Sequence, residues 1–404
     1  MMTFAKRWIW MLGLAALSVA VAPSIAPLVA APVTVQKRQS WSYEGGALVF
    51  SNDFSGARLN GVAPGEGEGR YTLTIDREGP GVSNASSWYA FAIESKTARK
   101  LEITLSYVWA RHRYAPKIRV GETGEWRALP SSQVKSGAAR NETVLTINAP
   151  AGRIYVSGGP MITLAEHTAW TDALVKTNAS FVTRREFGRS VAGRPLTVLE
   201  TRTAKAPDAG TVIVMTWQHP PEYTGTRAFQ GFVEIVLGDT AQARAFREKF
   251  NLVIVPVANP DGVHEGHWRN NLGDIDLNRD WRKFSQPETR ALSSLFKTVR
   301  NPVLFLDYHS TKKTLFYTQL DESAPVPNLF TLKWTDAHIA RFPKEKVSRD
   351  TNHNPDTATS RNWAAAELKV PSITVELADE APFEVCAAFG RFGAEEMMRL
   401  LMAP

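Results

Sequence analysis

Short segments of alternating apolar and polar residues dominate the chain between residues 41 and 157. The alternation is clear at residues 71–75 and 101–107, where every second residue is apolar. A period of two is typical of strands that bury one face. Further short apolar segments, separated by clusters of Gly, Pro, Asn and Ser, cover residues 88–93, 117–120, 143–147 and 154–156. This spacing predicts a small antiparallel β-sandwich domain over residues 38–160.

The pattern changes after residue 160. Four apolar segments rich in β-branched residues, at 212–217, 252–257, 303–307 and 373–376, predict buried strands. Between and after them, residues 226–237, 241–249, 287–299 and 383–401 have the composition of helices. Strands that alternate with helices predict a mixed α/β domain over residues 165–404, with a largely parallel sheet flanked by helices.

Two of the predicted strands are followed by residues of the types that commonly bind metals. The strand at 212–217 is followed by His219 and Glu222, and the strand at 303–307 is followed by His309. Ligands just past the ends of parallel strands meet at one edge of the sheet. Two His and one Glu form a catalytic zinc set, because three protein ligands leave the fourth position for water. The sequence therefore predicts one Zn²⁺ per chain.

Other charged residues supply the remaining chemistry of a hydrolase. Glu376 ends the strand at 373–376, where a carboxylate can take a proton from water at the metal. Arg269 and Arg279 lie between the predicted strands. One guanidinium can grip a substrate carboxylate in a bidentate contact, and the other can stabilise an oxyanion.

Composition and charge limit the other classes of function. Lys and Arg number 47, Asp and Glu number 40, and the net charge is +7 without a long basic block. This balance predicts no nucleic-acid partner. The chain has one cysteine, Cys386, so an internal disulfide is excluded and zinc must be held by His and carboxylate.

The N-terminus has the pattern of a signal peptide. Lys6 and Arg7 precede an uncharged segment at 8–22, and small residues near residue 30 offer a cleavage site. A segment of this length is short for a membrane-spanning helix. We therefore expect a signal peptide at 1–30, an exported protein in the periplasm or secreted, and no stable membrane span after cleavage.

The motifs of the second domain resemble those of one enzyme family, the M14 zinc metallocarboxypeptidases. Six motifs occur in the order of that family: His219-x-x-Glu222, Asn259-Pro-Asp-Gly262, Trp268-Arg269, Asp276-x-Asn278-Arg279, His309-Ser310 and Thr374-x-Glu376. The resemblance implies the zinc carboxypeptidase fold, with peptide or protein C-termini as substrate. It implies that His219, Glu222 and His309 bind the zinc, and that Asp276 orients His219.

The same resemblance assigns the catalytic roles. It implies that Glu376 acts first as general base and then as general acid. Arg269 is expected to polarise the scissile carbonyl, and Asn278 and Arg279 to hold the terminal carboxylate of the substrate. The family also has a mobile tyrosine in its active site, and Asn354 stands at that position in this sequence.

The N-terminal segment is similar to the β-sandwich that precedes the catalytic domain in the cytosolic carboxypeptidase subfamily. Residues 48–59 and 88–95 carry this likeness. Enzymes of the subfamily often remove glutamates from acidic protein tails. The predicted signal peptide disagrees with a cytosolic location, so cytoskeletal substrates are not implied.

Arg361 is a candidate determinant of substrate preference. Trp363 precedes Glu376 by 13 residues, which matches a tryptophan in the digestive members of the family. In that register Arg361 stands at the base of the pocket for the terminal side chain. A guanidinium at this position predicts a preference for acidic C-terminal residues.

Three other functions remain open at this stage. A zinc amidohydrolase that deacylates amino acids shares the same plan of ligands and catalytic glutamate. Export is also compatible with an enzyme that trims cell-wall peptides. The third alternative is a binding protein without activity on a peptidase scaffold.

Overall fold

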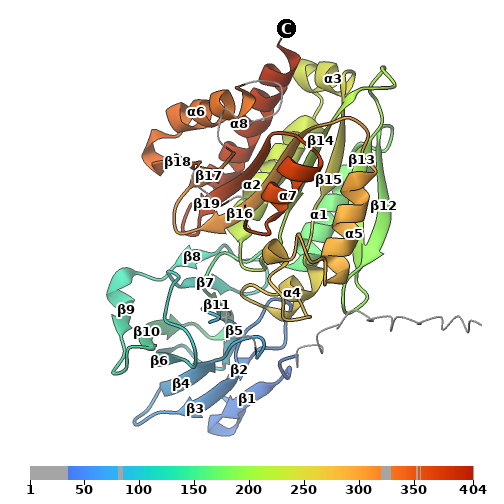
Figure 1. The fold of residues 1–404 in the computed structure, drawn as a ribbon. Coiled ribbons are helices and arrows are strands. Elements are labelled where there is room, and N and C mark those ends of the chain that lie inside the picture. Colours follow the sequence, from blue (N-terminus) through green and yellow to red (C-terminus); the bar gives the residue numbers. More distant parts are fainter. Residues whose placement is uncertain (1–34, 81–84, 320–328, 352–353, 355, 404) are drawn as a thin grey trace, which may run out of the picture.

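The computed structural model describes residues 35–80, 85–319, 329–351, 354 and 356–403. The predicted signal peptide at 1–30 lies outside these residues. Within them, two sheets form an N-terminal sandwich and a third forms the centre of an α/β unit (Figure 1). No helix among the described residues has the length and apolar character needed to cross a bilayer.

The sandwich contains eleven strands in two sheets, in the orders β1-β2-β5-β11-β7-β8 and β3-β4-β6-β10-β9. All neighbouring strands are antiparallel except β4 and β6, which are parallel. Their inward side chains form one apolar core between the sheets. The strands are β1 (Ser40–Tyr43), β2 (Leu48–Ser51), β3 (Gly61–Pro64), β4 (Arg70–Ile75), β5 (Ala90–Ser95), β6 (Arg99–Tyr107), β7 (Lys117–Val120), β8 (Arg127–Ala128), β9 (Val134–Ser136), β10 (Glu142–Ala149) and β11 (Gly152–Ser157).

The second unit is built on an eight-stranded sheet in the order β12-β13-β15-β14-β16-β19-β17-β18. The four central strands β15, β14, β16 and β19 are mutually parallel. Antiparallel pairs join β13 and β17 to them and β12 to β13, whereas β18 pairs parallel with β17. The strands are β12 (Val182–Arg189), β13 (Pro195–Thr201), β14 (Gly210–Thr216), β15 (Phe250–Val255), β16 (Pro302–Thr311), β17 (Leu315–Tyr317), β18 (Ser348–Asp350) and β19 (Ser372–Ala378).

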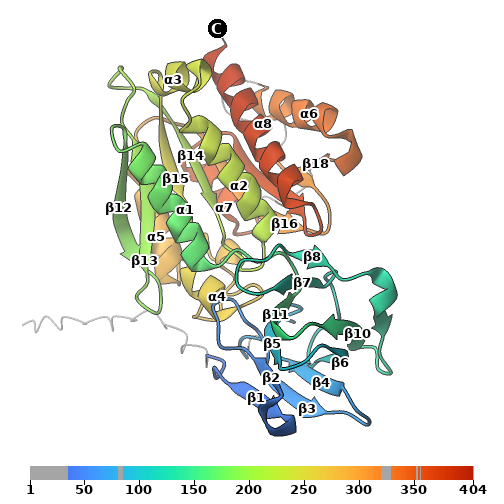
Figure 2. The same ribbon diagram turned by 180° about the vertical axis from the view of Figure 1, so that it is seen from behind.

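Helices cover both faces of this sheet. Val212 and Val214 of β14 point into the core beneath α2 and α8, whereas Ile213 and Met215 point into the core beneath α5 and α7. Figure 1 shows α5 and α7 in front of the sheet, and Figure 2, which is seen from behind, shows α1, α2, α3, α6 and α8 on the opposite side. The helices are α1 (Leu164–Thr177), α2 (Tyr223–Val236), α3 (Ala241–Arg247), α4 (Pro260–Glu265), α5 (Pro287–Lys297), α6 (Phe330–Arg341), α7 (Ser360–Glu367) and α8 (Phe383–Met402).

This architecture confirms the predicted fold class, a largely parallel sheet flanked by helices that follows a sandwich of mainly antiparallel strands. One detail differs, because β16 and β19 extend further than their apolar segments. His309 and Glu376 therefore lie within these strands, whereas the sequence predicted them at or past the strand ends. Polar residues can continue a strand when a neighbouring strand supplies backbone hydrogen bonds to them. The length of the apolar segment therefore underestimates the length of the strand.

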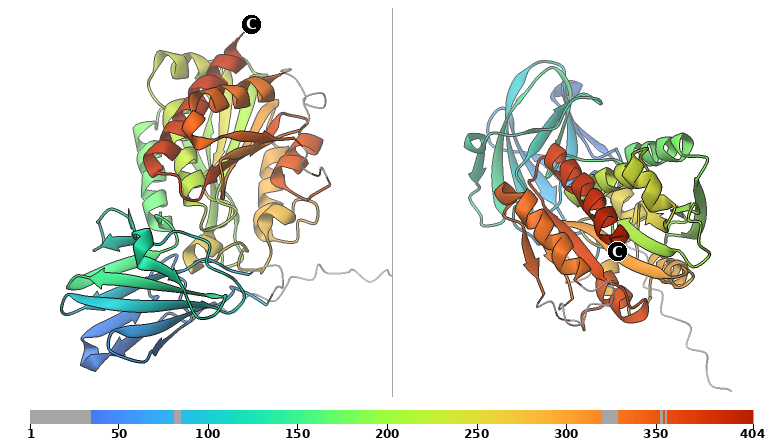
Figure 3. Two further views of the ribbon diagram at one scale, coloured as in Figure 1. Left: turned by 90° about the vertical axis from the view of Figure 1, so that its left-hand side faces the viewer. Right: turned by 90° about the horizontal axis from the view of Figure 1, so that it is seen from above.

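The sandwich packs against the end of the sheet at which α4 lies, as the side view in Figure 3 shows. An apolar cluster joins Trp88 and Tyr114 of the sandwich to Trp217 and Tyr223, which flank the turn after β14. The rings of Trp88 and Tyr223 have their centroids 5.5 Å apart. The sandwich therefore covers the carboxyl end of the central strands, where open α/β sheets bind ligands.

Candidate active site

The turn after β14 presents two of the predicted metal ligands. Trp217 begins this turn with a φ of +68°, in the left-handed region that non-glycine residues seldom adopt. Its indole is fully buried and donates a hydrogen bond to the carbonyl of Pro220, 2.8 Å away. Tertiary packing thus holds a strained backbone in the turn that carries His219 and Glu222.

His309 of β16 completes the predicted ligand set. Glu222 lies between the two imidazoles, with Oε1 2.8 Å from Nδ1 of His219 and Oε2 2.7 Å from Nδ1 of His309. The candidate ligand atoms of these three residues all lie within 4.8 Å of one another. Residues separated by 90 positions in the chain therefore meet at one point.

The turn and β16 are connected by a direct packing contact. Ser310 accepts hydrogen bonds from the Gly225 amide and the Thr224 hydroxyl in the first turn of α2, at 2.8 and 2.7 Å. A Cβ on Gly225 would lie 2.3 Å from the carbonyl oxygen of His309, so only glycine permits this approach. The start of α2, which follows Glu222, is fixed against the strand that carries His309.

A carboxylate stands behind each imidazole. Asp276 Oδ1 lies 3.0 Å from Nε2 of His219, and Asp307 Oδ2 lies 2.9 Å from Nε2 of His309. Metal-binding histidines usually donate their second ring N–H to such a partner, which fixes the tautomer. The sequence predicted Asp276 but missed Asp307. The available signal was the Asp307-x-His309 spacing, since residues two apart on a strand share a face.

Glu376 lies on β19 directly beside His309 in the parallel register. Burial raises the pKa of its carboxyl to about 7, although the charge of His309 acts to lower it. Its Oε2 atom is buried and has no hydrogen-bond partner among the described residues. A carboxylate with a pKa near neutrality and a free oxygen is suited to exchange protons with water.

Arg269 and Asp276 form a charged pair beside the ligand cluster. Nε of Arg269 donates to Oδ2 of Asp276 at 2.7 Å, and the other oxygen of Asp276 faces His219. Burial acts to raise the pKa of Asp276, but His219 and Arg269 outweigh it and lower the pKa well below its usual range. The carboxylate therefore stays ionised and connects the arginine to the metal ligand.

Asn278 and Arg279 lie in the short 3-10 turn η3 (Leu277–Arg279), which follows Asp276. Oδ1 of Asn278 accepts a hydrogen bond from the backbone amide of Ser360 at 3.0 Å, and its Nδ2 lies 3.5 Å from Nε2 of His309. Arg279 donates to the Asn278 carbonyl at 2.8 Å. The structure therefore places Asn278 next to His309 of the ligand cluster, and Arg279 next to Asn278.

Arg361 is buried at the start of α7, with 2% of its surface exposed. Its Nε and one of its Nη atoms have no hydrogen-bond partner among the described residues. Burial lowers the pKa of the guanidinium to about 10, while the charge of Asp350 acts to raise it. An incompletely paired buried cation is costly, so a ligand carboxylate would compensate it.

The residues of the cluster fit a zinc ion. The Nδ1 atoms of His219 and His309 face Glu222, and both Nε2 atoms are already held by carboxylates. Two imidazoles and one carboxylate are the donors of many catalytic zinc sites. The orphaned Oε2 of Glu376 offers a partner for a water at such an ion. The donor chemistry and this buried oxygen agree with the metal predicted from the sequence.

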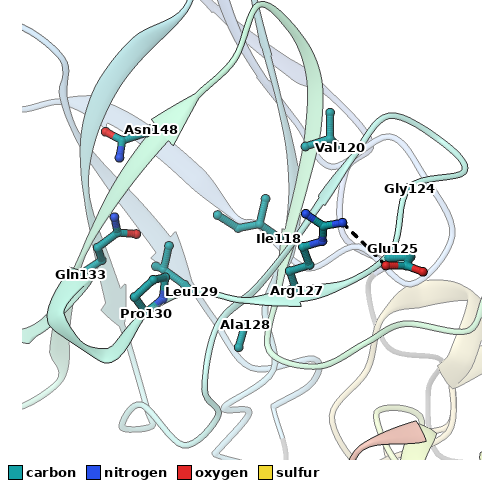
Figure 4. A pocket seen from close by; sticks show the side chains of 10 residues that line it. All are labelled: Ile118, Val120, Gly124, Glu125, Arg127, Ala128, Leu129, Pro130, Gln133 and Asn148. Atoms are coloured by element: carbon teal, nitrogen blue, oxygen red, sulfur yellow. Dashed lines mark ion pairs between the residues drawn. The ribbon is translucent and has the colours of Figure 1, made fainter. Parts of the chain in front are cut away.

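A cavity of about 440 Å³ is lined in part by Asp276, the carboxylate that contacts His219, and none of the three ligand residues lines it. Its walls include both predicted arginines and the carboxylate between them; they are formed by Arg269, Asp274, Ile275, Asp276, Arg279, Asp280, Lys283 and Ser285. Another hollow, of about 370 Å³, lies in the sandwich beside β7 and β8 (Figure 4). Glu125 and Arg127 are the ionisable residues that line it, so it lacks a set of metal ligands.

Comparison with known families agrees with this geometry. The family model described as zinc carboxypeptidase, peptidase M14, matches residues 167–391, more than half of the chain. A cytosolic carboxypeptidase 2 from Danio rerio is 32% identical over 186 residues, which are 42% of this chain and 25% of that protein. A cytosolic carboxypeptidase 6 from Mus musculus is 30% identical over 148 residues, 35% of this chain and 27% of that protein. The chain spans about a quarter of the length of these relatives.

Solved structures share the fold over most of the chain. A metallo-carboxypeptidase from Burkholderia cenocepacia has a TM-score of 0.73 and 17% identity, and covers 88% of this chain and 99% of its own. A metallo-carboxypeptidase from Pseudomonas aeruginosa has a TM-score of 0.70 and 19% identity, with 87% and 98% covered. The predicted fold is therefore confirmed by structures of low sequence identity.

The curated relatives overturn the prediction of an exported protein. They are named cytosolic carboxypeptidases, which conflicts with a signal peptide and with a periplasmic or secreted location. The prediction rested on two basic residues before an uncharged segment. This is a pattern of local charge and hydrophobicity, and it is not specific to exported proteins.

Proposed function

We propose that this chain, which belongs to the zinc carboxypeptidase family, hydrolyses the C-terminal peptide bond of peptides or proteins. The main support is the cluster of His219, Glu222 and His309, which Asp276 connects to a cavity lined by Arg269 and Arg279. A set of metal ligands alone is compatible with many hydrolases. Arginine side chains near it are suited to a substrate with a terminal carboxylate. The predicted peptide hydrolase is in agreement with the family.

His219, Glu222 and His309 would hold the zinc, which would supply Lewis-acid chemistry toward water and the scissile carbonyl. Glu376 takes a proton from the attacking water and then gives a proton to the leaving amine. Arg269, held by Asp276, faces the developing charge on the carbonyl oxygen. Because Asp276 also holds His219, one carboxylate sets the position of a metal ligand and of the arginine.

Asn278 and Arg279 hold the free carboxylate of the substrate in this proposal. Asn278 lies beside His309 and Arg279 lines the cavity, and these positions support this role. Peptides with amidated C-termini should therefore be poor substrates, and Arg279→Lys should weaken kcat/KM because a single ammonium cannot replace a bidentate fork. Arg282→Lys, at an exposed guanidinium that does not line the cavity, serves as the matched control. Equal rates on free and amidated peptides would contradict exopeptidase activity.

We further propose that Arg361 favours substrates with acidic C-terminal residues. Its burial, together with two nitrogen atoms without described partners, supports a role in pairing with a substrate carboxylate. The test compares kcat/KM for peptides that end in Glu and in Leu, in wild type, in Arg361→Ala and in Arg341→Ala as a surface control. The assignment is supported if Arg361→Ala loses the preference for Glu while Arg341→Ala keeps it. A wild-type preference for Leu would remove Arg361 from the pocket.

The division of the chain into a sandwich domain at 38–160 and a catalytic domain at 165–404 is part of the same proposal. The eleven sandwich strands lie within the first range, and α1 begins at Leu164 next to the second. All predicted metal, catalytic and substrate residues come from the second range.

A further inference from the structure

The segment that carries Arg269 has little regular structure of its own. It runs from Gly266, after α4, to Asp276, before η3, and we call residues 266–276 the arginine loop. Loops usually allow more movement than strands, yet an arginine that stabilises an oxyanion needs a fixed position. The question is which residues hold this loop in place.

The sandwich supplies a carboxylate that binds the loop backbone. Oε1 of Glu78, which follows β4, accepts hydrogen bonds from the amides of Trp268, Arg269 and Asn270, at 3.1, 2.8 and 3.1 Å. Glu78 is buried, with 3% of its surface exposed. A carboxylate that binds three consecutive amides in a buried place forms strong charge-assisted hydrogen bonds. The backbone of Arg269 itself is thus fixed by another domain.

Two further sandwich residues hold the beginning of the same segment. Arg58, which is 2% exposed, donates to the carbonyls of Gly266 and Glu265 at 3.1 and 3.2 Å. The Tyr114 hydroxyl accepts a hydrogen bond from the indole of Trp268 at 2.9 Å. These contacts are buried or partly buried, so water competes with them less than at an exposed surface.

The backbones of the two domains also approach closely at the start of the loop. Gly266 has a φ of +64°, and a Cβ there would lie 2.2 Å from the carbonyl oxygen of Ala57. Only glycine combines this conformation with so close an approach. The beginning of the loop therefore depends on the sandwich for its position.

We infer that Glu78 is a positioning residue for Arg269, so that the sandwich domain completes the active site of the catalytic domain. This inference rests on the role of Arg269 in the proposed function. Glu78 holds the backbone while Asp276 holds the guanidinium, and the two carboxylates together define where the positive charge lies. Small displacements of a catalytic group can reduce rates by about 10²-fold, so loss of Glu78 should affect turnover without removing the metal ligands.

The test is a double-mutant cycle in the full-length enzyme with zinc bound. Arg269→Ala should lower kcat/KM by about 10²–10³-fold, the usual cost of removing an oxyanion donor. Glu78→Ala should lower it by about 10–100-fold, mainly through kcat and with unchanged zinc content. Glu78→Gln retains an acceptor oxygen and should lose less. Glu94→Ala, at an exposed carboxylate of the same sandwich, is the matched control and should leave turnover unchanged.

The cycle separates positioning from a general loss of structure. If Glu78 acts through Arg269, Glu78→Ala should have almost no further effect when Arg269 is already Ala, because the two effects are not independent. Hydrogen exchange of the amides at 268–270 should also be faster in Glu78→Ala than in wild type. Multiplicative losses, or a Glu78→Ala enzyme with wild-type kcat, would overturn the inference. A fully active Arg269→Ala enzyme would instead refute the role of Arg269 in the proposed function.

Discussion

His309 and Glu376 lie on neighbouring parallel strands at the centre of the sheet, whereas Arg269 and Asp276 lie in a loop that the sandwich covers. We call the first pair the strand half of the site and the second pair the loop half. Backbone ladders on both sides fix the strand half. The loop half is fixed by side chains that bind its backbone, with Glu78 on one side and Asn271 on the other.

This difference suggests a division of roles. Sites on strands are held more precisely than sites on loops, because sheet register permits few alternatives. Changes in the strand half should therefore abolish metal binding or chemistry outright. Changes around the loop half should alter rates and stability by smaller amounts, since several weak anchors share the task.

The largest effect is expected for His309. His309→Ala removes a ligand from the centre of the sheet, and no other described histidine belongs to the cluster besides His219. The purified variant should lose its zinc, and hydrolysis should fall to background. The measurement is zinc per chain by elemental analysis, together with turnover of a blocked dipeptide.

The control for this experiment is His264→Ala, at a partly exposed histidine of α4 outside the cluster. It should keep both zinc and activity. Treatment of the wild type with a chelator should reproduce the His309→Ala result, and zinc should restore activity. Full activity in exhaustively chelated enzyme would rule out the zinc assignment.

Glu376→Gln should give the next largest loss. Gln has the same shape but cannot accept a proton, so turnover should fall by about 10²–10⁴-fold. Because Glu376 is not one of the three clustered ligand residues, the variant should retain its zinc. Glu367→Gln on the outer side of α7 is the control. Loss of zinc with normal activity per bound metal would show that Glu376 is a ligand instead of a base.

The two halves also differ in how well the sequence predicted them. Apolar segments identified the central strands, and the residues next to these segments gave His219, Glu222, His309 and Glu376. A buried strand has a strong local signature, so residues on it or at its end are placed by the strand itself. Recognising these segments as strands was therefore enough to predict that His309 and Glu376 lie close together.

The anchors of the loop half have no such signature. Glu78 precedes Arg269 by 191 residues and belongs to another domain. Contacts of this kind depend on tertiary packing, which hydrophobic periodicity does not report. In the strand half, Asp307 was missed although its spacing from His309 was visible, because an acidic residue at the end of an apolar segment resembles an ordinary strand end. The roles of Asn278 and Arg361 came only from family resemblance, as did the choice of Arg279 over Arg269 for the terminal carboxylate.

A paired substitution compares the two halves directly. Asp307→Asn and Asp276→Asn each weaken the carboxylate behind one imidazole, so each should reduce zinc affinity by about 10–100-fold. Asp276 also holds Arg269, so Asp276→Asn should in addition lower kcat at saturating zinc. Asp307→Asn should leave kcat closer to wild type under the same conditions. Equal kcat values for the two variants would show that the loop half does not depend on Asp276.

The smallest effect concerns Glu288, which anchors the loop from the side opposite the sandwich. Its Oε2 accepts a hydrogen bond from the Asn271 amide at 2.9 Å, and Asn271 in turn binds the amides of Gly273 and Ile275. Burial raises the pKa of Glu288 to about 7, from an ordinary value of 4.5. Between about pH 4.5 and 7, the Glu288 carboxyl is therefore protonated in the folded protein and ionised in the unfolded chain.

The stabilisation from this proton is complete below pH 4.5 and is lost as the pH rises through about 7. At 1.36 kcal/mol per pKa unit, the loss is at most about 3 kcal/mol. Glu288→Gln is neutral at all pH values, so its free energy of unfolding should lack this decline. Urea unfolding at pH 5 and pH 8 should show wild type losing stability relative to Glu288→Gln, while the exposed-site control Glu94→Gln follows wild type. Parallel pH profiles for wild type and Glu288→Gln would mean that Glu288 is ionised in the folded protein, and that Asn271 is held by a charged partner on this side of the loop as well.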